Sequence, residues 1–165
     1  MDVRWKPNVT VAAIVEDRGR YLLVEEHTAD GLRLNNPAGH LDPGESLLQA
    51  VAREALEETA RAFTPTHLVG VYLARSGADE LTYLRFAFGG IASPPVTGWQ
   101  LDHGIVRTLW LTPAEIEATQ ARHRSPLLWR CVQDHQAGRR YPLELLASFV
   151  SGALSPPEIG SVNPA

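Results

Sequence analysis

Apolar residues recur along the chain in short β-branched or alternating runs, the pattern of strands that lie in a sheet. These runs cover residues 9–15, 21–24, 32–34, 67–74, 81–88 and 105–111. Turn-forming residues at 17–20 and 76–79 separate neighbouring runs, so we expect two hairpins. Gly and Pro recur between residues 89 and 104, which we interpret as one long loop.

Residues 46–59 form the strongest predicted helix, because they contain neither Gly nor Pro and are rich in Ala, Leu, Glu and Arg. Either Ser46 caps this helix or Glu45 favours its N-terminal dipole. Two further helices are expected near the end of the chain. One begins at a Thr-Pro-Ala-Glu capping sequence at 112–115, and the other runs from a Ser-Pro pair at 125–126 to near Gly138.

The first of these helices gathers acidic side chains along one side. At about 100° per residue, Glu54, Glu57 and Glu58 fall within an arc of about 100°. A separate arc holds the apolar side chains Leu48, Val51, Ala52, Ala55 and Leu56. Carboxylates with this spacing can converge on a hard divalent cation, and Mg²⁺ prefers a few such ligands together with water and substrate phosphates. The alternative is a solvated charged face on which Glu57 pairs with Arg61.

The segment ahead of the helix offers a further ligand. Pro37 has no backbone N–H, so we expect strand pairing to stop there. The backbone at Ala38-Gly39 would then be free to bring a carbonyl to a cation. Arg53, within the helix, can orient Glu45 or Glu57 through charge-assisted hydrogen bonds.

Composition narrows the class of protein. A chain of 165 residues that is 44% hydrophobic and 21% charged suits one globular domain with a single sizeable core. The formal net charge of -4 disfavours binding to nucleic acid or to an anionic membrane. Cys131 is the only cysteine, and the start of the chain lacks the pattern of a signal peptide. We therefore expect a cytoplasmic protein, either a monomer or a homodimer. The ligands that Mg²⁺ takes from substrate phosphates predict a small phosphorylated molecule as the substrate.

The stretch from Gly39 to Ala60 resembles the Nudix box. Five residues separate Gly39 from Glu45, and seven more lead to Arg53-Glu54, followed by Glu57-Glu58. This resemblance implies a Nudix hydrolase of the α/β class, an α/β/α sandwich with a mixed β-sheet and a loop-helix catalytic motif. Such enzymes split a diphosphate linked to another group with the help of Mg²⁺, for which Mn²⁺ may substitute. The implied metal ligands are the carboxylates of Glu54, Glu57 and Glu58 and the backbone carbonyl of Ala38.

Two positions of the box depart from the family pattern. Ala60 stands where the family usually has Gly, and Arg61 stands where it usually has an apolar residue. Gly at the first of these positions supplies a left-handed helix cap. We therefore expect the helix to lack this cap and to run on a little further.

Further segments extend the resemblance to the NudJ-type phosphatase branch of the family, over roughly residues 6–149. They read KPNVTVAAIVE, NNPAGHL, TYLRFAF, RSPL and RYPLELL. Residues 1–149 are accordingly predicted to form a single Nudix domain, and residues 150–165 a flexible tail. The resemblance implies hydrolysis of nucleoside di- and triphosphates with release of orthophosphate, and of the thiamine precursor hydroxymethylpyrimidine pyrophosphate.

Two other functions remain open. One is a Nudix pyrophosphatase for another nucleoside-diphosphate-linked substrate, such as a nucleotide sugar, a dinucleoside polyphosphate or an oxidised nucleotide. The other is a ligand-binding Nudix module without catalysis. The intact acidic and basic positions of the box, Glu45, Arg53, Glu54, Glu57 and Glu58, speak against the second.

Hydrolysis at phosphorus requires an in-line water, neutralised phosphate oxygens and a group that activates the water. The candidate bases are Glu54 and Glu58, and Arg53 and Glu45 complete the catalytic set. Asp102, in the loop before the last predicted strand, is a candidate for an additional acid or metal ligand. The alternative for Asp102 is a plain loop-capping role.

The substrate pocket is predicted from residues outside the box. Arg85 and Tyr83 share one face of a predicted strand, opposite an apolar face. We interpret Arg85 as a phosphate ligand and Tyr83 as a platform for a base, the alternative being a surface Arg that covers an aromatic ring. Asn36, Trp99 and Lys6 are further candidates for the pocket.

Overall fold

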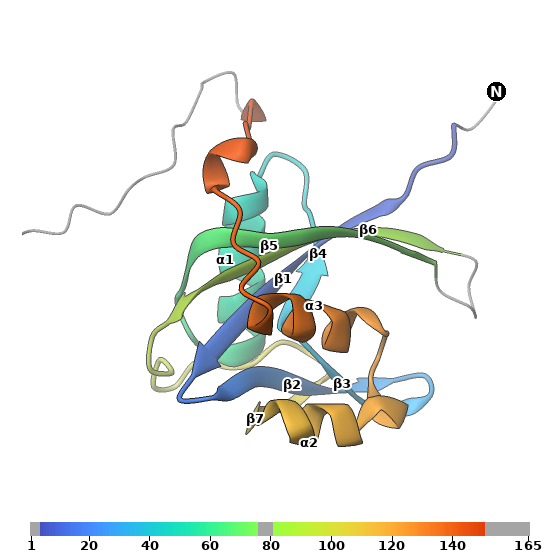
Figure 1. Ribbon diagram of the computed structural model, residues 1–165, viewed down its shortest axis with the longest axis vertical. Helices are drawn as coiled ribbons and strands as arrows, with labels where there is room; N and C mark the ends of the chain where they lie inside the picture. Colours follow the sequence, from blue (N-terminus) through green and yellow to red (C-terminus); the bar gives the residue numbers. More distant parts are fainter. Residues whose placement is uncertain (1–3, 76–80, 151–165) are drawn as a thin grey trace, which may run out of the picture.

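The computed structural model of the protein describes residues 4–75 and 81–150, which form a mixed β-sheet between two layers of helices (Figure 1). The strands are β1 (Asn8–Asp17), β2 (Arg20–Thr28), β3 (Gly31–Asn35), β4 (Ala38–His40), β5 (Phe63–Arg75), β6 (Thr82–Ala92) and β7 (Ile105–Leu111). Their order is β3-β2-β1-β6-β5, with β4 paired to β1 and β7 paired to β2. Strands β1 and β6 are parallel, and the other pairs of these strands are antiparallel, so the predicted mixed sheet is confirmed.

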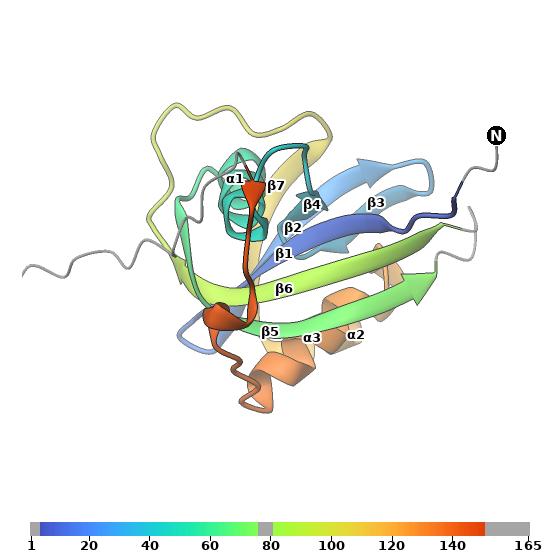
Figure 2. The same cartoon turned by 90° about the horizontal axis from the view of Figure 1, so that it is seen from above.

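Helices cover both faces of the sheet. Helix α1 (Leu47–Thr59) lies on one face, and α2 (Pro113–Ala118) and α3 (Leu127–Gln136) lie on the other, as Figure 2 shows. A short 3₁₀ turn, η1 (Gln120–Arg122), joins α2 to the segment that leads into α3. The expected α/β/α sandwich is therefore confirmed.

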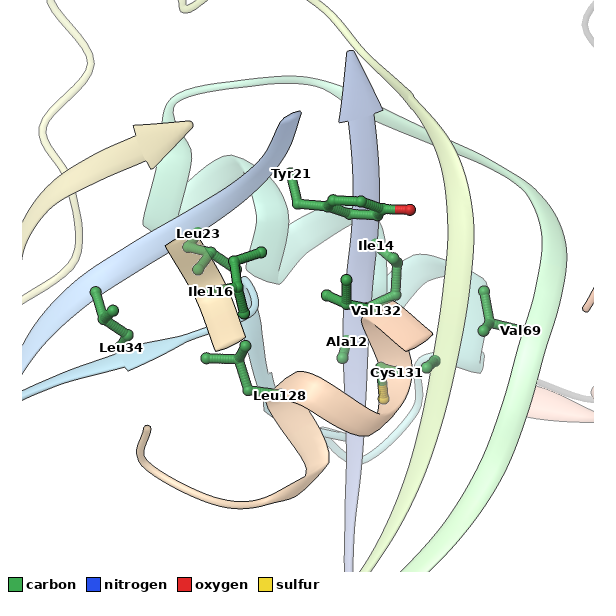
Figure 3. Close-up of a cluster of buried hydrophobic side chains, with 11 residues drawn as sticks. Ala12, Ile14, Tyr21, Leu23, Leu34, Val69, Ile116, Leu128, Cys131 and Val132 are labelled. Atoms are coloured by element: carbon green, nitrogen blue, oxygen red, sulfur yellow. The ribbon is translucent and has the colours of Figure 1, made fainter. Parts of the chain in front are cut away.

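The alternation of side chains along β1 feeds two cores. Ala12 and Ile14 face the layer of α2 and α3, whose Ile116, Leu128 and Cys131 pack against them (Figure 3). The residues that alternate with them along β1 face α1 and pack against the apolar side chains of that helix. They are Val11, Ala13 and Val15. Because both faces of β1 are buried, the strand reads as a nearly continuous apolar run.

The predicted starts of α1 and α2 are confirmed by their caps, whereas α3 begins at Leu127, directly after the predicted Ser-Pro pair, with no side-chain cap. The Ser46 hydroxyl accepts a hydrogen bond from the Gln49 N–H, and the Gln49 side chain accepts one from the Ser46 N–H, which makes a capping box at α1. Thr112 and Glu115 form the same arrangement at α2. Of the two alternatives at α1, Ser46 rather than Glu45 is thus the capping residue.

The end of α1 differs from the expectation. Ala60 adopts the left-handed conformation, with φ 58° and ψ 21°, and its N–H donates to the Leu56 carbonyl, so the helix stops at Thr59 instead of running on. The following loop holds this end in place. The Asp102 N–H donates to the Glu57 carbonyl, and the Val96 N–H donates to the Ala60 carbonyl. Tertiary hydrogen bonds therefore impose on alanine a conformation that glycine adopts more easily.

The expectation that pairing stops at Pro37 is wrong. The Pro37 carbonyl accepts from the Ala13 N–H, and β4 continues the ladder with Thr10–Ala12 of β1. Pro37 stands at the start of the strand, where its missing N–H is not needed, and its carbonyl can still take part.

Strand β6 also runs further than predicted, to Ala92 instead of residue 88. Gly89 and Gly90 pair with β1 and β5 and so continue the strand. Glycine is needed at position 89 because the His67 ring of β5 covers it, with Nε2 2.0 Å from the position of a Cβ atom. The loop before β7 therefore covers residues 93–104. Of the features expected from the sequence, the turn at 76–79 lies outside the described residues, and so does the tail beyond residue 150.

The C-terminal segment crosses the edge of the sheet at β5. Tyr141 and Leu68 exchange two backbone hydrogen bonds of 2.9 Å, which close this part of the edge. The turn η2 (Leu143–Leu145) follows, and Leu143 and Leu146 pack against the core on the α1 side. Within the described ranges, no helix is long and apolar enough to cross a membrane.

Candidate active site

Strand β4 joins the sheet to the acidic end of α1. Ala38 stands opposite Ala12, and the ladder bonds at Pro37 and Leu41 place the hydrogen-bonded pairs on either side of this position. Ala38 therefore belongs to a non-hydrogen-bonded pair, and its N–H and C=O both point away from β1. The N–H donates to Glu58 Oε2 at 2.9 Å. Register, rather than a loss of pairing, turns the Ala38 carbonyl toward α1.

Gly39 makes room for the carboxylate of Glu54. A Cβ atom on Gly39 would lie 2.1 Å from Glu54 Cδ and 2.1 to 2.2 Å from its two oxygens. The carboxylate of Glu54 is thus packed directly over the backbone of β4, and Glu54 is only 9% exposed. The first glycine of the box is required by this close approach.

Arg53 links the remaining acidic residues of the box. Its Nε and Nη2 donate to the two oxygens of Glu45 at 3.0 and 2.7 Å, and its Nη1 donates to Glu54 at 2.8 Å and to Glu57 at 2.9 Å. Nη2 also reaches the His40 carbonyl of β4 at 2.9 Å. The paired guanidinium holds the pKa of Glu45 below its usual range.

The acidic side of α1 is not a solvated face. Glu54 and Glu58 are buried on the same side of the helix as Val51 and Ala55, so the expected separation into a packed side and an acidic side is wrong. Glu57 pairs with Arg53 and not with Arg61. The Arg61 guanidinium lies 5.5 Å from the ring centroid of Trp110 and donates to the Ser93 carbonyl.

Burial concentrates negative charge at this end of the helix. Desolvation raises the pKa of Glu58 to about 8; the Ala38 hydrogen bond opposes this rise, and the nearby carboxylates of Glu54 and Glu26 add to it. Desolvation also raises the pKa of Glu54, although the bonds from Arg53 act in the opposite direction. A bound cation would relieve both effects.

The donor set fits a hard divalent cation. Carboxylates of Glu54, Glu57 and Glu58 and the carbonyl of Ala38 offer oxygen ligands only, the kind that Mg²⁺ prefers. In the described part of the chain, no three acidic, His or Cys side chains already surround a common point. Since Arg53 occupies oxygens of Glu54 and Glu57, these carboxylates must share their oxygens between Arg53 and a cation, or turn away from Arg53, when a cation binds.

Asp102 lies beside the box. Its backbone N–H donates to the Glu57 carbonyl at 3.0 Å, and its charge contributes, after burial and Glu57, to the raised pKa of Glu54. The loop before β7 thus brings a further carboxylate to the C-terminal end of α1.

The predicted pocket residues divide into two groups. Arg85 is 8% exposed and Asn36 is 1% exposed, so Arg85 is not the surface residue of the alternative interpretation. Tyr83 is half-buried, and its ring centroid lies 6.4 Å from that of His40. Lys6 and Trp99, by contrast, are exposed, and neither side chain forms a hydrogen bond or ion pair within residues 4–75 and 81–150. The structure therefore does not join Lys6 and Trp99 to the carboxylates.

Glu26 and Arg124 belong to the surroundings of the site but were not among the residues predicted for it. Glu26 is buried on β2, and Arg124 Nη1 donates to its Oε2. Both charges act on the Glu58 carboxyl, where Glu26 raises the pKa and Arg124 lowers it. The sequence gives a signal for this pair. Glu25 and Glu26 directly follow the apolar run 21–24 in the same strand, and a charge buried there requires a partner.

Fold and site together define a hydrolase of the NUDIX family. The family profile for the NUDIX domain matches residues 5–130, and the chain belongs to this family. Its members act on small phosphorylated substrates and use divalent metal ions.

Individual relatives extend the match over most of the chain. The protein "Phosphatase NudJ" of Escherichia coli (strain K12) is 38% identical over 147 residues, which cover 88% of this chain and 94% of that protein. The solved NUDIX hydrolase from Nitrosomonas europaea is 48% identical and has a TM-score of 0.86, covering 90% of this chain and 100% of its own. The MutT NUDIX hydrolase from Burkholderia pseudomallei, 18% identical with a TM-score of 0.67, shares the fold.

Proposed function

We propose that the protein hydrolyses the phosphoanhydride bonds of nucleoside di- and triphosphates in the cytoplasm, releasing orthophosphate and using Mg²⁺, for which Mn²⁺ can substitute. The observation that carries this proposal is the pair of buried carboxylates, Glu54 and Glu58, at the outer edge of β4 beside the Ala38 carbonyl. The likeness to a protein named a phosphatase supports release of orthophosphate. The resemblance to the NudJ-type branch adds hydroxymethylpyrimidine pyrophosphate as a second substrate.

Glu54, Glu57, Glu58 and the Ala38 carbonyl would hold the metal ion. When bound, such an ion neutralises non-bridging phosphate oxygens and lowers the pKa of a coordinated water. Arg53, fixed in two places by Glu45, keeps the carboxylates of Glu54 and Glu57 in position.

The structure leaves the two candidate bases with different surroundings. Glu58 Oε2 accepts the Ala38 N–H, which leaves Oε1 to take a proton from the attacking water. Glu54 has one oxygen bonded to Arg53 and the other available. Asp102 is proposed as an additional acid or metal ligand from the loop before β7.

A second candidate function keeps the metal site and changes the substrate to a nucleotide sugar, a dinucleoside polyphosphate or an oxidised nucleotide. Product analysis separates the two. Orthophosphate from a nucleoside triphosphate means attack at the terminal phosphorus, whereas pyrophosphate and a monophosphate mean attack at an internal one. A ligand-binding module without catalysis would release neither product.

The deciding experiment is a phosphate-release screen with Mg²⁺. The substrates are nucleoside di- and triphosphates, hydroxymethylpyrimidine pyrophosphate, ADP-ribose and dinucleoside polyphosphates. We expect turnover of the first two classes, and a complete loss of turnover in the presence of EDTA. Orthophosphate release from none of these substrates would refute the proposal.

Variants of the carboxylates test the metal site. Glu57→Gln and Glu58→Gln are expected to abolish Mg²⁺-dependent turnover without unfolding the protein. Glu58→Gln keeps an oxygen that can accept from Ala38 and removes a carboxyl whose charged form is disfavoured by burial, so its stability should equal or exceed that of the wild type. Glu117→Gln, on the exposed side of α2, is the matched control and should retain full turnover. Near-normal turnover of either box variant would contradict the assignment.

A further inference from the structure

Arg85 is a buried arginine without an anionic partner in the described part of the chain. It is 8% exposed, and its Nε and Nη1 are both buried without a hydrogen-bond acceptor. A guanidinium taken out of water without an ion pair is unfavourable, and the Cys131 thiol and the Glu58 carboxylate offset this only in part, so burial still lowers the pKa of Arg85. A buried unsatisfied group of this kind in a native structure calls for an explanation, and a bound anion is one that also supplies the missing charge.

Two buried carboxylates, Asp134 and Glu26, are engaged elsewhere, whereas Glu58 acts electrostatically on Arg85 without forming an ion pair with it. Asp134 accepts hydrogen bonds from Tyr72 and Arg130, and pairs with Arg139 as well. Glu26 pairs with Arg124. Neither of these carboxylates is therefore positioned to neutralise Arg85.

Arg85 lies on the face of the sheet that α3 covers. Its neighbours in register are Thr10 on β1 and Tyr72 on β5, and Ala87, two residues further on β6, packs into the core beneath α3. The hydroxyl of Thr10 is also buried without a partner. Two adjacent strands thus present unsatisfied polar groups side by side.

This position is within reach of the proposed metal site. Ala38, Ala12 and Ala87 lie in register across β4, β1 and β6, so Ala38 and Ala87 are two strand spacings apart, or about 10 Å. Arg85, two residues before Ala87 on β6, lies in register with Thr10 of β1 and, across β1, with His40 of β4. Burial is the main cause that lowers the pKa of Arg85, and Glu58 is among the groups that oppose this effect, so the two charges act on each other.

We propose that Arg85 is a specificity-determining residue that binds the phosphate of the substrate next to the one attacked. This assignment rests on the proposed function. The guanidinium lacks a negative charge beside it and acceptors for its N–H groups. A phosphate supplies both, because two of its oxygens can accept from two parallel N–H groups of the guanidinium. A neutral base would supply acceptors but would leave the buried charge uncompensated. Arg85 thereby selects diphosphate-containing molecules over monophosphates.

The first test uses wild-type protein in EDTA with inorganic pyrophosphate as the probe, so that it depends on neither the metal nor turnover. Pyrophosphate is expected to raise the melting temperature, and inorganic phosphate at the same concentration is expected to raise it less. An absent or equal response to pyrophosphate in the wild type would overturn the inference.

The second test uses Arg85→Met, which keeps the length of the side chain and removes the charge. Its stability should not fall below that of the wild type, whereas its affinity for pyrophosphate should weaken roughly 30-fold or more. Arg20→Met is the matched control, because it also removes one positive charge but at the start of β2, opposite Asp17 of β1, where Arg20 pairs with Glu115. This control should bind pyrophosphate as the wild type does.

The outcomes separate the inference from the proposed function. If the wild type hydrolyses nucleoside di- or triphosphates while Arg85→Met retains the wild-type KM and pyrophosphate affinity, the role of Arg85 is refuted and the function stands. Loss of stability in Arg85→Met with unchanged pyrophosphate affinity would show a structural role instead. Should Arg85→Met fail to fold, Arg85→Lys decides, since it keeps the charge but loses the fork and is expected to raise KM with a smaller effect on kcat.

Discussion

Replacing Gly39 with Ala should move the Glu54 carboxylate without changing its chemical nature, and so tests whether its position matters for catalysis. The Glu54 carboxyl carbon lies 2.1 Å from where the new Cβ atom would stand, and ordinary van der Waals contact begins at 3.4 Å. The carboxylate must therefore move by at least 3.4 − 2.1 = 1.3 Å. A displacement of about 1 Å at a catalytic group costs about 100-fold in rate. We expect kcat for phosphate release to fall by about two orders of magnitude.

The fold should tolerate the same change. The collision is with the end of a flexible side chain, and alanine is favoured over glycine within a strand by roughly 0.5–1 kcal/mol. The free energy of unfolding, measured in urea, should stay within about 1 kcal/mol of the wild-type value. A loss of turnover therefore cannot be attributed to unfolding.

Gly89→Ala provides the control for this experiment. Its new Cβ atom would meet Nε2 of His67 at 2.0 Å, so the change also displaces a side chain from over a strand, but the displaced group is not part of the box. This variant should turn over substrate at the wild-type rate. If Gly39→Ala retains kcat within about threefold of the wild type, well short of the 100-fold expected, the place of Glu54 over β4 is not needed for catalysis.

Two further predictions concern stability. Ala60→Gly should raise the free energy of unfolding by about 1 kcal/mol in urea, because a residue with a Cβ atom is strained at φ 58°; a lower value would show that the strain is absent. Burial is the main cause that lowers the pKa of His135 from 6.5 to about 4, so the folded protein keeps this ring neutral while the unfolded chain protonates it. Stability should therefore be complete above pH 6.5 and be lost as the pH falls toward 4, by up to about 3 kcal/mol. His135→Gln should gain on the wild type by that amount over this range, and parallel pH profiles would contradict the shift.

Local features of the structure follow from the sequence, and features that depend on distant partners do not. The capping boxes at Ser46 and Thr112 involve residues three apart, so residue type alone predicts them. The end of α1 is different. Its last carbonyls are satisfied by Val96 and Asp102, which stand more than thirty residues later in the chain, and these bonds outweigh the intrinsic preference of Ala60.

The same distinction holds within the site. The spacing of the box predicts that Glu54, Glu57 and Glu58 lie close together, because residues three and four apart are neighbours on a helix. Glu54 and Glu58 are buried because they pack against β4. The sequence alone does not predict this burial, because Pro37 favours an end to strand pairing. Alternation along β6 places Arg85 on the face of the strand opposite Phe86 and Phe88. The burial of Arg85 depends on α3, a later part of the chain that packs over the face carrying Arg85.

The register of β4 turns the crowded acidic helix into a site. Gly39 stands opposite Val11, whose side chain packs on the α1 side of the sheet, so the absent side chain of Gly39 also faces α1, where the Glu54 carboxylate fills the space. Ala38, one residue earlier, then directs its N–H and C=O outward to the same helix. A shift of one residue would turn both groups of Ala38 toward β1 and leave Glu58 without its donor. Pro37 takes part in this register through its carbonyl, which accepts from the Ala13 N–H, and so the residue expected to end the pairing instead belongs to the ladder that brings the carboxylates to the sheet.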